Sequence, residues 1–138
     1  MRQYPIEIDD KTYTGTTASA KEQFEALHIA GRTGLAGLLV EEGVKPHSIV
    51  VMLISIPYQD LERLRTLLVK DKVFRDSDEV PVAENLFRDE IHNYYLIIAH
   101  AIRENLGGFS KLRRQTGAPT AEPTPSTPTS AGTSGAPV

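Results

Sequence analysis

The sequence predicts a small, mainly α-helical domain with a minor β component: four to five helices, one or two short β-hairpins and a disordered C-terminal tail. Three observations predict it. Apolar residues recur at helical spacing, two short stretches alternate like strands, and the composition changes abruptly at Gln115. From there Pro, Thr, Ser, Ala and Gly dominate, so too little apolar surface is present to offset the entropy of ordering. We therefore expect one domain over residues 1–114 and a disordered tail over 115–138.

Two hairpins are expected. Residues 4–14 alternate apolar and polar side chains around the turn residues Asp9-Asp10. Pro5 fits such a strand only at the edge of a sheet. The second candidate, over 72–83, is centred on the polar turn 76–78.

The first helix is expected over about residues 20–31. Ser19 and Glu22 have the spacing of a capping box, and Phe24, Leu27 and Ala30 share one face. After Gly31 and Gly34 the helical pattern resumes with Leu35, Leu38 and Leu39. We expect this second helix to continue to Glu42, with Gly43 as its C-cap.

Three further helices are expected. Residues 48–55 form an apolar run whose periodicity does not separate buried helix from buried strand, and we favour helix because prolines flank it. Asp60 is the expected N-cap of the next helix, which carries a leucine stripe. The longest helix is expected to start at Asn85 or Asp89 and end at Gly107-Gly108, with one broad apolar face: Ile91, Tyr94, Tyr95, Ile98, Ile102 and Leu106. Phe109 and Leu112 form a last short apolar piece.

Composition excludes several classes of function. The chain has no cysteine and a net charge of −3, with positive residues scattered among acidic ones. Nucleic-acid-binding proteins usually present a basic face, so we expect no nucleic-acid partner. The longest mostly apolar stretch, Ile49–Ile56, is far short of the roughly 20 residues of a membrane helix. The N-terminus also lacks an apolar signal-peptide region, and we expect a soluble cytoplasmic protein.

No constellation of catalytic residues is apparent. The chain has no Gly-x-Gly-x-x-Gly, no Walker loop and no Gly-x-Ser-x-Gly elbow. Asp89 and His92 have the spacing of a weak metal pair, but zinc sites need three or four ligands and nothing nearby supplies the others. We expect a protein that is not an enzyme, with no catalytic residue, cofactor or metal.

The order of these features resembles the tail assembly chaperones of long-tailed bacteriophages. The resemblance covers about residues 3–114 and rests on three stretches of sequence: Ile8-Asp9-Asp10-Lys11-Thr12-Tyr13, Ser19-Ala20 followed by Glu22-Gln23-Phe24, and Ile102-Arg103-Glu104-Asn105-Leu106-Gly107-Gly108-Phe109. It implies a protein of the host cytoplasm, absent from the finished virion, that binds the tape-measure protein and recruits tail-tube subunits. A longer frameshifted product is common in such genes, and the tail is compatible with a spacer.

Two segments, Leu35–Leu39 and Ile49–Ile56, carry more apolar surface than a small domain easily buries. Large exposed apolar patches usually mark partner sites. The candidate partner-binding residues in these segments are Leu35, Leu38, Leu39 and Val51. Tyr95 is a further candidate, because one of the adjacent tyrosines Tyr94 and Tyr95 is expected near the rim of the core, and aromatic residues at a rim are common at interfaces. The alternative, that both segments are simply core, is equally open.

Two other functions stay open. One is a small regulator that binds a host protein or DNA, although the cations of the 60–70 helix are interspersed with Asp60 and Glu62. The other is a structural component of the virion.

Overall fold

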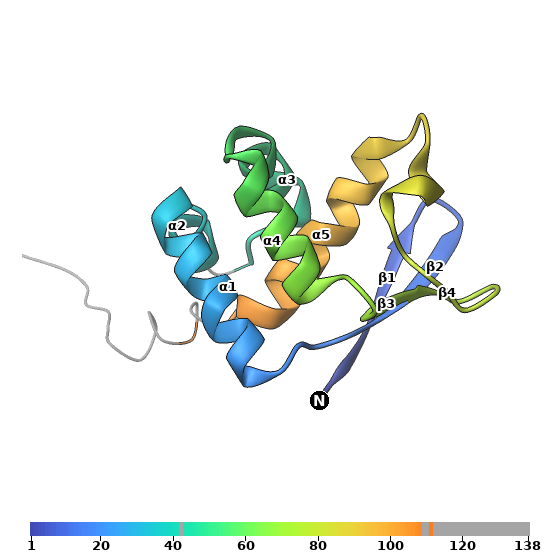
Figure 1. The fold of residues 1–138 in the computed structure, drawn as a ribbon, viewed down its shortest axis with the longest axis horizontal. Helices are drawn as coiled ribbons and strands as arrows, with labels where there is room; N and C mark the ends of the chain where they lie inside the picture. Colours follow the sequence, from blue (N-terminus) through green and yellow to red (C-terminus); the bar gives the residue numbers. More distant parts are fainter. Residues whose placement is uncertain (42, 109–110, 112–138) are drawn as a thin grey trace, which may run out of the picture.

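The computed structural model describes residues 1–41, 43–108 and 111 (Figure 1). Within these residues the chain forms five α-helices, one short 3-10 helix and four strands. Three expectations lie outside the described residues: the tail over 115–138, the short apolar piece at Phe109 and Leu112, and the helix end at Glu42. None of the helices in the described part is long and apolar enough to cross a lipid bilayer.

The four strands form one antiparallel sheet in the order β1-β2-β3-β4. Both expected hairpins are present: β1 (Gln3–Ile8) pairs with β2 (Lys11–Thr16), and β3 (Val73–Arg75) pairs with β4 (Val80–Pro81). The strands β2 and β3 also pair, with Tyr13 opposite Arg75.

This β2–β3 pairing corrects the expected fold class. The domain is not mainly α with a minor β component, because the two hairpins join into a single four-stranded sheet and make the fold α+β. The paired strands are separated in the chain by four helices, α1 to α4. Alternation of side chains predicts a strand but says nothing about which distant strand it pairs with.

Two residues of the β1–β2 hairpin, Pro5 and Gly15, are explained by their places in the sheet. Pro5 is tolerated because β1 pairs on one side only, with β2. Tyr4 lies opposite Gly15, and a Cβ atom at Gly15 would overlap the Tyr4 ring. The glycine is therefore needed so that the buried Tyr4 ring can lie across β2.

Helix α1 (Ala20–Thr33) begins with the expected capping box. The Glu22 amide donates to the Ser19 hydroxyl at 3.2 Å, and the Ser19 amide donates to the Glu22 carboxylate at 3.0 Å. Gly34 ends the helix in the left-handed region, with φ +86°. The short α2 (Ala36–Leu39) follows.

The apolar run forms helix α3 (Pro46–Ser55), as favoured, with proline in its first turn. Helix α4 (Tyr58–Leu68) begins after Pro57, so Asp60 lies in the first turn and is not the N-cap. Helix α5 (Ile91–Leu106) starts later than expected, because residues 84–87 form the 3-10 helix η1 (Glu84–Phe87). Asp89 has φ +65°, a left-handed conformation that cannot start a right-handed helix.

Helix α5 is the centre of the domain. It contacts α1, α3, α4, η1 and β1, and Figure 1 shows it running between the other helices and the sheet. Its core face is turned slightly from the expected one. Ile97, Ile98 and Ile102 are buried, whereas Ile91 is half exposed.

Candidate protein-interaction site

Four large apolar side chains are exposed on the helices α3, α4 and α5. Val51 and Ile54 on α3, Tyr58 at the start of α4 and Ile91 at the start of α5 have exposed fractions of 68%, 64%, 71% and 51%. We call these four residues the apolar patch. They belong to helices that follow or contact one another: α3 leads directly into α4, and both α3 and α4 pack on α5.

The exposure on α3 follows from its sequence. Helix α3 buries Ile49 and Leu53, four residues apart on one face. At 100° per residue, Val51 and Ile54 point away from that face. A helix that is apolar on all sides is normally buried, but α3 is covered on one side only. Its outer face is therefore apolar surface that the domain itself does not bury.

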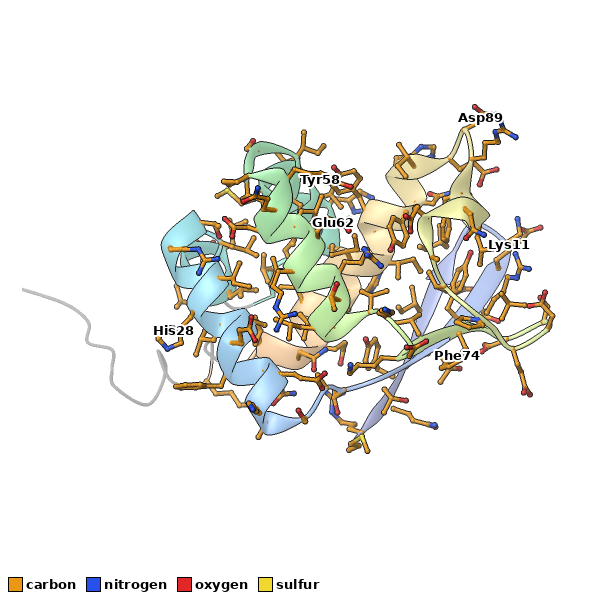
Figure 2. The ribbon with its side chains drawn as sticks, in the orientation of Figure 1. Lys11, His28, Tyr58, Glu62, Phe74 and Asp89 are labelled. Carbon is orange, nitrogen blue, oxygen red and sulfur yellow. The ribbon has the colours of Figure 1, made fainter. Side chains whose placement is uncertain are left out.

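A groove lies between the N-terminal halves of α4 and α5, beside the patch. It has a volume of about 220 Å³, and two patch residues, Tyr58 and Ile91, stand in its walls. Figure 2 labels Tyr58 and Glu62 on the α4 side. The complete lining is Tyr58, Leu61, Glu62, Arg65, Glu84, Ile91, Tyr94, Tyr95 and Ile98. We call it the α4–α5 groove.

The polar groups of the groove are organised around Arg65. Its guanidinium donates to both carboxylate oxygens of Glu62, at 2.9 and 3.3 Å, and holds the pKa of Glu62 below its usual range. Burial raises the pKa of the Tyr94 hydroxyl, and the adjacent Arg65 opposes that shift. The charge of Glu62 raises the pKa of Tyr58. Glu84, at the start of η1, forms no ion pair with any described residue.

The structure places the five candidate binding residues in different surroundings. Val51 belongs to the apolar patch, and the half-buried Tyr95 lines the groove. Leu35 and Leu39 are instead core residues, with exposed fractions of 0% and 1%. They are corrected as binding candidates, because their four-residue spacing puts both side chains on the inner face of a single turn. Leu38 is half-buried on α2, packs against the core and does not line the groove.

Sequence reasoning missed two residues of the patch. Tyr58 was expected to precede the helix with Asp60 as its N-cap, and Ile91 was expected on the core face of a longer helix. Each of these residues is the first residue of a helix, α4 or α5, that starts at a different position from the expected one. The sequence therefore did not predict which side of each helix start faces the core. Phe24 shows the same error as Ile91. It was expected to face the core, but it is 65% exposed and contacts the His28 ring edge-on at a centroid distance of 5.0 Å.

The Glu-Asn-Leu-Gly-Gly ending has an architectural role. The Asn105 amide oxygen accepts from the Ala18 backbone N–H at 2.8 Å and from the Gln23 side chain at 3.0 Å, and its NH2 group donates to the Ala101 carbonyl. Glu104 binds the Arg2 guanidinium at 2.8 Å. The end of α5 is thereby tied to the start of α1 and to the N-terminal segment.

We expect Asn105→Ala to lower the free energy of unfolding by about 1–3 kcal/mol, because a part-buried N–H at Ala18 loses its acceptor. Urea unfolding measures this. Asn85→Ala is the matched control: Asn85 is exposed on η1 and its loss should change stability by less than about 0.5 kcal/mol. Equal effects of the two substitutions would show that the Asn105 bonds do not stabilise the domain.

The described residues contain no group of three or more His, Cys, Asp or Glu side chains placed to hold a metal ion. Burial is the main cause that lowers the pKa of the His100 imidazole.

The class that the fold and the site define is thus a small α+β domain with an apolar patch beside a groove. No protein-family model matches the chain, and neither the curated proteins nor the solved structures contain a significant match.

Proposed function

We propose that this protein is a non-enzymatic binding protein that holds an apolar segment of another protein on the apolar patch and in the α4–α5 groove. The observation that carries the proposal is the exposure of Val51, Ile54, Tyr58 and Ile91 on adjoining helices. Exposed apolar patches on soluble domains usually mark partner sites. A groove between two helices accepts the apolar face of a third helix through side chains spaced i, i+3, i+4 and i+7.

Within that class we propose a phage tail assembly chaperone of the host cytoplasm, which binds the tape-measure protein and recruits tail-tube subunits. The resemblance over residues 3–114 supports this assignment. The chemistry of the partner supports it too, because a tape-measure protein is a long, helical and partly apolar chain. Such a chain presents the kind of segment that an apolar patch can cover before tail assembly.

Co-expression with the tape-measure protein of the same phage tests the proposal. We expect the tape-measure protein to stay soluble and to co-purify with the wild-type chain. Val51→Asp should lower the amount captured by at least about tenfold, since a charge facing an apolar partner is desolvated without compensation. Because Val51 is exposed, circular dichroism of this variant should match that of the wild type.

Phe24→Asp is the matched control. Phe24 is 65% exposed, close to the 68% of Val51, but it lies near Leu106 at the other end of α5. This variant should capture the tape-measure protein as the wild type does. Equal losses in both variants would contradict the site. Absence of capture of tape-measure or tail-tube protein, together with stoichiometric recovery in mature particles, would make the protein a structural component of the virion.

A further inference from the structure

We infer that the occupant of the α4–α5 groove is an amphipathic helix with a lysine or arginine beside its apolar face, and that Glu84 pairs with this cation. The inference rests on the proposed function and specifies the partner chemistry of the same site. It starts from the charges in the groove. Three charged side chains line it, and two of them, Glu62 and Arg65, neutralise each other through two hydrogen bonds.

Glu84 is the third charged side chain in the lining of the groove. It is exposed at the start of η1, and no described residue forms an ion pair with it. It lines the groove together with Tyr58 on α4 and Tyr94 on α5. The groove therefore carries a net negative charge, located where an occupant would pass.

Two acidic residues also lie just before α5, next to the lining residue Ile91 but outside the lining itself. Asp89 and Glu90 stand there against one cation, Arg88, and all three are exposed. Asp89 is labelled in Figure 2 on the loop just before α5. Next to them, Ile91 forms the apolar end of the groove wall. An apolar surface with an acidic border is complementary to an apolar segment with a basic border.

The size of the groove fits side chains of a helix better than a free small molecule. Pockets for small ligands usually measure about 300–1,000 Å³. The α4–α5 groove has only about 220 Å³, and Tyr58 and Ile91 of the apolar patch stand in its walls. One or two anchoring side chains fill such a groove while the rest of the helix lies over the patch.

The cation follows from the cost of covering Glu84. A helix seated in the groove removes water from this carboxylate, and an ionised group that loses water without a partner is strongly unfavourable. A lysine or arginine on the occupant removes that penalty, and an acidic residue there increases it. Glu84 thus selects among apolar helices by charge.

The test uses the full chain and synthetic peptides that tile the tape-measure protein of the same phage, with dissociation constants measured by fluorescence polarisation. We expect the peptides that bind to be apolar and to carry Lys or Arg next to the apolar face. Glu84→Lys should weaken their binding by about tenfold at low salt, and the difference should shrink at 0.5 M salt, where charges are screened beyond about 4 Å. Replacing the peptide cation by Glu should restore binding to Glu84→Lys.

Glu7→Lys, which changes the net charge equally at an exposed position of β1, should leave the affinity unchanged. Peptides whose binding is lost in Val51→Asp but equal in Glu84→Lys and wild type would overturn this inference and leave the proposed function standing. If no peptide binds the wild type, the proposed function fails and the inference with it. Self-association that Val51→Asp abolishes would place a second copy of the chain on the apolar patch, which also overturns the inference.

Discussion

Ile98→Ala is expected to lower the free energy of unfolding by about 2–5 kcal/mol, as truncations of buried isoleucines do. Ile98 is 1% exposed in the middle of α5, the helix that contacts α1, α3, α4, η1 and β1. The loss combines the transfer free energy of the removed methyl and methylene groups with the cavity left behind. Because α5 is held from several sides, the surroundings have little freedom to close that cavity.

Urea unfolding followed by circular dichroism measures the effect. Arg103→Ala is the control on the same helix, because Arg103 lies on the polar side and its ion pair with Glu104 is long, at 3.6 Å. Its loss should cost no more than about 0.5 kcal/mol, as is usual for surface positions. Equal costs for Ile98 and Arg103 would mean that a different face of α5 points into the core.

The elements that could be predicted from the sequence are those whose signals are local. The capping box of Ser19 and Glu22 predicted the start of α1. The prolines that flank residues 48–55 predicted a helix there, which is confirmed although the segment contains β-branched residues. Both hairpins were also predicted correctly, because their strands flank the turn residues that the sequence indicated. In each case the deciding interaction is made within a few residues of chain.

What was missed depends on distant contacts. The pairing of Tyr13 with Arg75 joins the hairpins into one sheet, and no local pattern encodes it. The exposure of Phe24 has the same origin, because helical spacing predicts which residues share a face but not which face the rest of the domain covers.

The candidate site was predicted only in part for the same reason. An apolar excess around Leu35–Leu39 and Ile49–Ile56 was visible in the sequence, and the two segments have opposite outcomes. The domain buries Leu35 and Leu39 but leaves Val51 and Ile54 exposed. The groove needed the three-dimensional arrangement, since its walls come from α4, η1 and α5.

The contrast between Leu39 and Val51 gives the prediction with the largest effect. We expect Leu39→Asp to unfold the domain at neutral pH. Leu39 is 1% exposed within the apolar core, and an unpaired carboxylate buried there costs several kcal/mol, beyond the loss of the leucine side chain. Domains of this size are stable by only about 5–15 kcal/mol, so one such substitution removes much or all of the stability.

Val51→Asp is the matched variant, with the same type of substitution at a position that is 68% exposed. It should unfold at nearly the wild-type urea concentration, within about 0.5 kcal/mol. Leu39→Asp should give the far-UV circular dichroism of an unfolded chain and no cooperative transition. Both variants should fail to capture a partner, but Leu39→Asp fails because the domain is unfolded and Val51→Asp because a folded surface has become charged. A folded Leu39→Asp with normal stability would show that Leu39 faces solvent, and would return the Leu35–Leu39 segment to the binding surface.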